Sequence, residues 1–169
     1  MKKLFLLGLA SVLLISCQEQ QRYSQLSLEI ETFKAVINDY DTKNWESYVS
    51  HYADTSKTRF NNVSMASSEI PNYHKGNDMN YSSRSFVEKG QEYEMVLDDE
   101  RKTWVNFWGT WKGTLAANNK ELTIPVHLTA RFVDGKIVED YGYWDISEVI
   151  LSLQAIEEAG KIDEVELSE

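Results

Sequence analysis

The sequence contains few of the residue patterns by which catalytic and metal-binding proteins are usually recognised. Its 169 residues include one cysteine, Cys17, and three histidines, so the folded domain has no disulfide and no thiol chemistry. No cluster of His, Cys, Asp or Glu has the spacing of metal ligands, and no glycine-rich phosphate loop or nucleophile elbow is present. We therefore expect neither a metal nor a cofactor.

Positive charge is also scarce. The chain has 17 Lys and Arg residues against 27 Asp and Glu residues, and its formal net charge is −10. Without Lys2 and Lys3, 17 − 2 leaves 15 basic against 27 acidic residues, a net charge of −12. This balance disfavours nucleic acid and anionic membrane surfaces as partners.

The one long apolar run, at residues 4–15, is shorter than the roughly 20 residues of a membrane-spanning helix and is typical of a signal peptide. It ends in Leu14-Ile15-Ser16-Cys17, which is similar to the lipobox of bacterial lipoproteins. We therefore expect residues 1–16 to be removed and Cys17 to be lipidated, with an ordinary secretory signal as the alternative. Because Gln18 follows the cysteine, and not Asp, we expect the lipid to anchor the protein in the cell outer membrane. Residues 17–23 would form the lipidated tether.

The remainder is predicted to be one α+β domain at residues 24–156, with an acidic tail at residues 157–169. Helical spacing of apolar residues predicts two N-terminal helices, and shorter helices are expected after Ser85 and after Ser147. The helices are expected at residues 24–38, 42–53 and 85–90 and from residue 147 on. A polar loop is expected at residues 64–81. Strands are expected at residues 58–63 and on both sides of the charged turn at residues 98–102. The second of the two strands that flank this turn runs through residues 103–115.

A β-hairpin is the clearest pattern in the chain. Asp134-Gly135 lies between two strand-like runs, and this dipeptide is typical of a two-residue turn. The incoming strand places apolar side chains on one face at Leu122, Ile124, Val126, Leu128, Ala130 and Phe132. A two-residue loop then pairs Phe132 with Ile137, and an unbroken ladder pairs Ile124 with Asp145.

With that register, the returning strand sends polar groups toward the apolar side. The inward residues would be Ile137, Glu139, Tyr141, Tyr143 and Asp145, and the outward ones Val138, Asp140, Gly142 and Trp144. Burying an unpaired carboxylate is costly, so such a row normally lines a cavity or is tied into hydrogen bonds. The pattern predicts a pocket with a polar floor.

This region also resembles a known family. Residues 131–139, followed by Tyr141 and Asp145, look like the end of a SnoaL-like domain of the nuclear transport factor 2-like superfamily. In that family the strand ends in Trp, an Asp follows four residues later, and a Gln lies on a short helix beyond. The matching positions here are Tyr141, Asp145 and Gln154. The resemblance implies an α+β fold in which a cone-shaped, curved antiparallel sheet wraps around N-terminal helices.

In cyclase members of the family that Asp is the general acid/base, so Asp145 is the candidate catalytic residue. The alternative is that Asp145 caps the helix that begins near Ser147. The candidate ligand-binding residues are Tyr141, Tyr143, Trp108, Asn106 and Tyr52. The chain departs from the cyclases in one respect: the inner face of the strand from Ile124 to Phe132 is wholly apolar, where cyclases tend to supply a second polar group.

Two classes of function remain open. The favoured one is a lipid-anchored envelope domain whose aromatic pocket binds a small, largely apolar ligand. The alternative is an enzyme that moves a proton on a carbonyl compound through Asp145, in a cyclisation or isomerisation. Trp144 is predicted to point away from the core, which suggests a homodimer through the outer face of the sheet.

Overall fold

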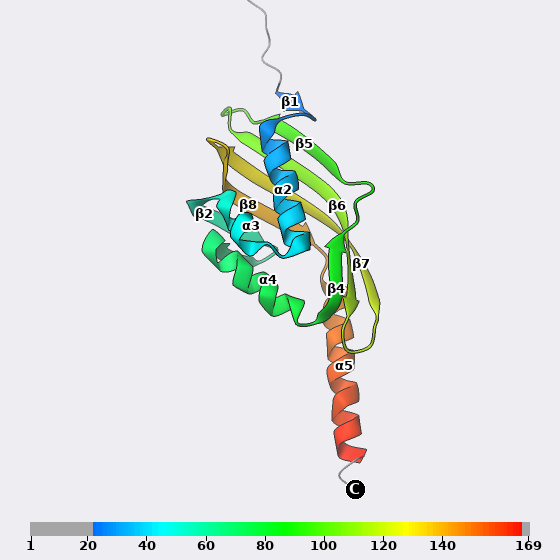
Figure 1. Ribbon diagram of the computed structural model, residues 1–169. Helices are drawn as coiled ribbons and strands as arrows, with labels where there is room; N and C mark the ends of the chain where they lie inside the picture. The colour runs from blue at the N-terminus through cyan, green and yellow to red at the C-terminus, as the bar shows by residue number, and fades with distance from the viewer. Residues whose placement is uncertain (1–21, 167–169) are drawn as a thin grey trace, which may run out of the picture.

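The computed structural model describes residues 22–166, with side chains described for residues 22–160. Eight strands form one curved sheet, and helices lie along its concave face (Figure 1). The strands are β1 (Tyr23–Ser24), β2 (Tyr52–Phe60), β3 (Val63–Ala66), β4 (Tyr81–Phe86), β5 (Glu92–Leu97), β6 (Thr103–Leu115), β7 (Glu121–Val133) and β8 (Lys136–Trp144). The helices are α2 (Leu28–Thr42), α3 (Trp45–Ser50), the 3-10 turn η1 (Ser67–Glu69), α4 (Ile70–Asp78) and α5 (Ser147–Glu166).

The sheet is antiparallel except at one junction. Its order is β1-β5-β6-β7-β8-β2-β3, and β4 pairs with the second half of β6 while β5 pairs with the first half. Strands β2 and β8 run parallel, so at that junction the sheet is mixed and differs from the antiparallel sheet that the resemblance implies. The parallel pairing brings the chain segment after α3 beside the C-terminal hairpin.

Helix α2 forms the centre of the core. Ser27 caps its first turn by accepting a hydrogen bond from the Ile30 amide. Helical spacing gathers its apolar residues on one stripe, and Ile30, Phe33, Val36 and Ile37 are buried against the sheet. The Phe33 ring makes edge contacts with two strand residues, at centroid distances of 6.4 Å to Phe107 and 6.5 Å to Phe132. The predicted N-terminal helices are thus confirmed, with α3 shorter than expected.

The hairpin between β7 and β8 has the predicted turn. Asp134 and Gly135 both take positive φ, 49° and 75°, as the turn requires. Val133 pairs with Lys136 and Phe132 with Ile137, but the register shifts immediately afterwards. Arg131 then pairs with Glu139, so Val138 is the extra residue of a β-bulge.

That bulge reverses the predicted faces of β8. Beyond it, Ala130 pairs with Asp140 and Val126 with Trp144, so Asp140, Gly142 and Trp144 face the core. The predicted inward row of Glu139, Tyr141, Tyr143 and Asp145 is therefore wrong. A side-chain period of two means that one inserted residue sends every later side chain to the opposite face.

Three other segments differ from prediction. The stretch expected as a polar loop contains β3, η1 and α4, and the short helix expected after Ser85 is absent because Ser85 and Phe86 complete strand β4. The final helix α5 continues to Glu166 through residues expected as tail, and it extends away from the sheet (Figure 1). Its stripe of Val149, Leu153 and Ile156 packs against the end of the sheet.

The signal-peptide, lipidation and tether predictions fall mainly on residues 1–21, which lie outside the described residues. Within the part of the chain that the structure describes, none of the helices is long and apolar enough to cross a membrane.

Candidate ligand-binding site

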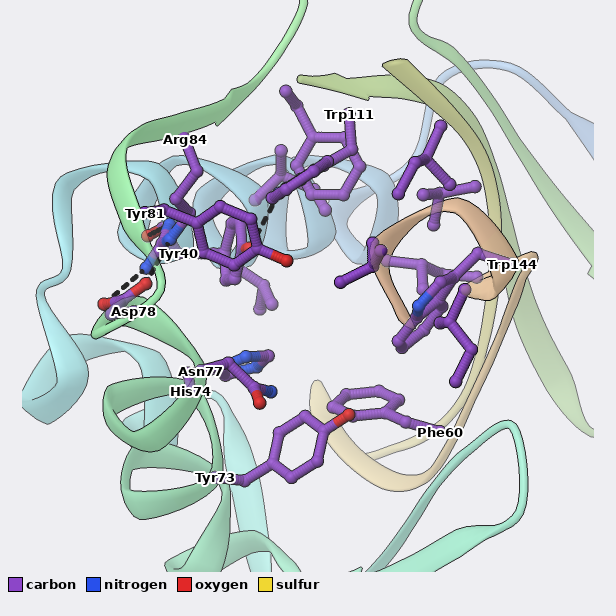
Figure 2. A pocket seen from close by; sticks show the side chains of 18 of the residues that line it. Tyr40, Phe60, Tyr73, His74, Asn77, Asp78, Tyr81, Arg84, Trp111 and Trp144 are labelled. Carbon is purple, nitrogen blue, oxygen red and sulfur yellow. Dashed lines mark hydrogen bonds and ion pairs between the residues drawn. The ribbon is translucent and has the colours of Figure 1, made fainter. Parts of the chain in front are cut away.

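A cavity of about 320 Å³ lies between the concave face of the sheet, helices α2 to α4 and the start of α5. Figure 2 shows aromatic side chains of several elements around it, with Phe60, Tyr73 and Trp144 on one side and Tyr81 and Trp111 on another. The polar residues that line it are Tyr40, Tyr48, Tyr52, Tyr73, His74, Asn77, Asp78, Asn80, Tyr81, Arg84 and Asp140. Aromatic and aliphatic side chains make up the rest of the lining, so the cavity is mainly apolar and carries polar groups from several elements.

Asp140 is a carboxyl group enclosed in this apolar surrounding. It is 2% exposed and reaches the inner face because of the bulge in β8. The Tyr52 hydroxyl donates a hydrogen bond of 2.7 Å to Asp140 Oδ2. Burial raises the pKa of Asp140 to about 7, and the Tyr52 hydrogen bond opposes the rise. Asp140 can therefore either hold or release a proton near neutral pH.

Two tyrosines continue from this carboxyl group. Tyr52 and Tyr48 lie on β2 and α3, their rings stack at a centroid distance of 5.4 Å, and their hydroxyl oxygens are 3.1 Å apart. Burial, followed by the charge of Asp140, raises the pKa of both tyrosines well above 10. Both hydroxyls consequently stay protonated and act as hydrogen-bonding groups, since neither can ionise at ordinary pH.

His74 lies on α4 in a surround of aromatic rings. It stacks on Trp45 at 5.4 Å and makes an edge contact with Tyr40 at 4.9 Å. Burial, reinforced by the positive charge of Arg84, lowers the pKa of His74 to about 3. The ring is therefore neutral, and its Nε2 atom has no hydrogen-bond partner.

Arg84 is the one Lys or Arg residue among the described residues that line the cavity. Its guanidinium group bonds both carboxylate oxygens of Asp78, at 2.6 Å and 3.2 Å, and donates to the Tyr40 carbonyl. It also lies 3.8 Å from the centre of the Tyr40 ring. The pKa of Asp78 is lowered because the hydrogen bonds and charges of Arg84 and Lys43 outweigh its partial burial. The positive charge of Arg84 is thus paired inside the protein.

Four buried side-chain atoms of the described residues have no hydrogen-bond partner within the protein. They are Ser56 Oγ, Thr58 Oγ1, His74 Nε2 and Asp140 Oδ1. Thr58 pairs with Asp140 across the parallel junction, so the two side chains share the inner face. Buried polar groups in native proteins normally have partners. Two of the four atoms, His74 Nε2 and Asp140 Oδ1, belong to residues that line the cavity, where a ligand can supply the missing partner.

Most of the candidates predicted from sequence lie elsewhere. Tyr52 lines the cavity as expected. Asp145 is exposed and accepts a hydrogen bond from the Ser147 amide, which lowers its pKa. It therefore caps the start of α5, as the alternative proposed. The cavity lining also does not include Tyr141, Tyr143, Trp108 or Asn106.

Those four residues lie on the outer face of the sheet. Trp108 and Tyr143 are 40% and 50% exposed, and His127 stacks between them at 4.9 Å and 6.4 Å. Tyr141 donates to Glu139, and Asn106 donates to Glu94. Tyr141 and Tyr143, which were predicted to face the pocket, thus lie with Trp108 on the outer, convex face of the sheet.

Sequence reasoning missed Asp140, Trp144 and His74. For His74 a signal was present: Ile70, Tyr73, His74 and Asn77 follow the i, i+3, i+4, i+7 spacing of a helix, and Pro71 is typical of a first helical turn. No comparable signal marks the bulge in β8. The described residues contain no group of three His, Cys, Asp or Glu that could hold a metal ion.

No protein-family model and no curated protein sequence matches the chain. The fold is nevertheless similar to solved structures. A putative polyketide cyclase from Xanthomonas campestris aligns with a TM-score of 0.62 and 12% identity, over 76% of this chain and 98% of its own. A putative SnoaL-like polyketide cyclase from Shewanella denitrificans aligns with a TM-score of 0.59 and 12% identity, over 77% and 99%.

A third similar structure is a protein from Catenulispora acidiphila with a ketosteroid isomerase-like fold, in complex with trimethylamine. It aligns with a TM-score of 0.58 and 12% identity, over 69% of this chain and 87% of its own. At such identities the likeness shows the fold alone. The predicted SnoaL-like, nuclear transport factor 2-like fold is confirmed.

Proposed function

We propose that the protein is a lipid-anchored domain of the cell envelope whose cavity binds a small, largely apolar molecule. The observation that carries the proposal is the aromatic cavity of about 320 Å³ in which His74 Nε2 and Asp140 Oδ1 are buried without partners. Ligand pockets are typically apolar with a few convergent polar groups. The trimethylamine complex of one protein with the same fold supports a small-molecule ligand.

A neutral fluorescent probe, N-phenyl-1-naphthylamine, tests the cavity. We expect saturable binding at one site, because aromatic and aliphatic side chains form most of the cavity wall. Leu128→Trp fills the cavity and should weaken binding by roughly tenfold or more, since the probe loses its space. Thr123→Trp on the exposed face of the same strand is the control and should leave binding unchanged. Equal affinity in both variants would contradict binding in the cavity.

The location is tested by replacing Cys17. We expect Cys17→Ala to move the protein from the membrane fraction to a soluble fraction, because the variant can carry no lipid. The wild-type protein is expected in the outer membrane fraction. Retention of the variant in membranes would contradict lipid anchoring through this residue.

A second candidate function is proton transfer on a carbonyl compound. It is favoured by the pKa of Asp140, about 7, which suits a general acid or base near neutral pH. Asp140 then takes the role first considered for Asp145, with Tyr52 as its hydrogen-bond partner. Deuterium exchange at the α-carbon of cyclohexanone, followed by NMR, tests this activity. We expect exchange that Asp140→Asn abolishes, and equal exchange with both proteins would contradict it.

A further inference from the structure

The carboxyl group of Asp140 has no counter-charge in the structure. Its hydrogen-bond partner, Tyr52, is neutral, and no described lysine or arginine forms an ion pair with it. Arg84 is the only lysine or arginine among the described residues that line the cavity, and it is already paired with Asp78. From this arrangement we propose that the polar end of the ligand is an organic ammonium group, which pairs with Asp140 and lies against the aromatic walls. The inference rests on the proposed binding function.

A buried charge is normally paired, because an isolated charge in an apolar environment is very costly. Asp140 avoids this cost in the free protein by holding a proton over part of the pH range. A ligand cation removes the cost in another way, since it supplies the missing opposite charge. Oδ1 is the oxygen that remains available, because Oδ2 already accepts from Tyr52.

The walls of the cavity suit a cation as well. The Phe60 ring lies 5.5 Å from Trp144 and 5.8 Å from Tyr73, and these three side chains surround one side of the cavity (Figure 2). Aromatic faces attract cations, most strongly where water is excluded, and quaternary ammonium groups are recognised in this way. His74 is neutral and therefore adds no repulsion.

The competing ligand is a neutral molecule whose carbonyl oxygen accepts a hydrogen bond from protonated Asp140. The two ligands require opposite protonation states of the same carboxyl group. A cation binds the ionised form and is bound more tightly as the pH rises through about 7, whereas a carbonyl binds the protonated form and is bound less tightly. The pH dependence of binding therefore distinguishes them.

Phenyltrimethylammonium and tert-butylbenzene form a matched pair of probes, identical in shape and different in charge. Calorimetry or ligand-detected NMR measures their binding to the whole protein. We expect the cation to bind roughly tenfold more tightly than the hydrocarbon. Its affinity should fall by roughly tenfold for each unit of pH below about 7. The probe has no titratable proton, so this dependence reports on the protein alone.

Two variants assign the effect to Asp140. Asp140→Asn keeps the shape and the hydrogen bond from Tyr52, so we expect it to fold and to lose the preference for the cation. Glu139→Gln, the adjacent outward carboxylate, is the control and should keep that preference. Tyr52→Phe removes the hydrogen bond that opposes the raised pKa of Asp140, so the pH midpoint of cation binding should move upward.

Each result has a distinct meaning. Equal or tighter binding of tert-butylbenzene, unchanged in Asp140→Asn, would overturn the ammonium inference and leave the apolar binding site intact. A cation preference that persists in Asp140→Asn would also overturn it. Binding of neither probe, together with no binding of N-phenyl-1-naphthylamine, would overturn the proposed function itself.

Discussion

The two faces of strand β8 place adjacent carboxylates in opposite situations. Glu139 faces outward, where it pairs with Arg131 at 2.6 Å and accepts a hydrogen bond from Tyr141. These interactions outweigh its partial burial and lower its pKa. Asp140 faces inward, where burial raises its pKa to about 7. One residue of separation thus distinguishes a stabilising ion pair from a destabilising buried acid.

The same contrast holds for the aromatic residues. On the outer face, Trp108, His127 and Tyr143 stack on one another across three neighbouring strands. On the inner face, Trp144 and Trp111 border the cavity. Both faces are rich in aromatic rings, so composition alone does not reveal which one binds a ligand. The difference is that the inner rings enclose unfilled space and unpaired polar atoms.

The largest expected effect concerns the two carboxylates. The pKa of Asp140 rises from 3.8 unfolded to about 7 folded, so the folded state holds the extra proton between these values and loses stability as the pH rises through them. Asp140→Asn should therefore raise the free energy of unfolding at about pH 8, by up to about 4 kcal/mol. The gain should fall below about 1 kcal/mol near pH 4 and vanish below about pH 3, where Asp140 is protonated in both states.

Glu139→Gln should have the opposite sign. The folded pKa of Glu139 is lowered, so its contribution is present above the unfolded pKa, and the substitution should cost less than about 1 kcal/mol at about pH 8. Urea unfolding at both pH values measures both variants. Loss of stability in Asp140→Asn at about pH 8 would show that the carboxylate has a partner we have not identified.

Two tryptophans give the next comparison. Trp144→Ala removes a ring packed against Phe60 beside the cavity and should cost about 3 kcal/mol in free energy of unfolding. Trp108→Ala removes a ring that is 40% exposed and should cost no more than about 1 kcal/mol. Denaturant midpoints measure both. Equal costs would contradict the assignment of the two faces.

The third effect concerns His74. Its pKa falls from 6.5 unfolded to about 3 folded, so the unfolded chain takes up a proton in this range and the folded state loses stability as the pH falls. His74→Phe removes this loss while keeping an aromatic ring. We compare the free energy of unfolding of the variant with that of the wild type at two pH values. The difference should favour the variant by about 2 kcal/mol more at about pH 5 than at about pH 7.5. A difference that does not depend on pH would rule out a neutral buried histidine.

The sequence predicts the sheet better than the site, for a local reason. The turn at Asp134-Gly135 and the apolar face of β7 follow from side-chain alternation, and both are confirmed. The inward residues of β8 depend on the bulge at Val138, which neither glycine nor any other local signal marks. A one-residue error in the register of β8 leaves the strands in place, so the predicted fold remains correct. The same error exchanges Asp140 for Glu139 on the inner face, so the predicted site is wrong.

The smallest effect on stability is expected on the outer face of the sheet. The homodimer was first inferred from an outward Trp144, and that reason is wrong because Trp144 borders the cavity. The outer face nevertheless carries Trp108 and Tyr143, both large and exposed, and we still expect it to pair with a second copy.

Trp108→Glu should convert the dimer of a soluble form lacking residues 1–17 to a monomer in sedimentation velocity. The same substitution should change the free energy of unfolding of the monomer by less than about 1 kcal/mol. Val133→Glu, an exposed site at the hairpin turn, is a control that should leave the dimer intact. A wild-type monomer at tens of micromolar would show that the exposed rings of the outer face do not mediate self-association.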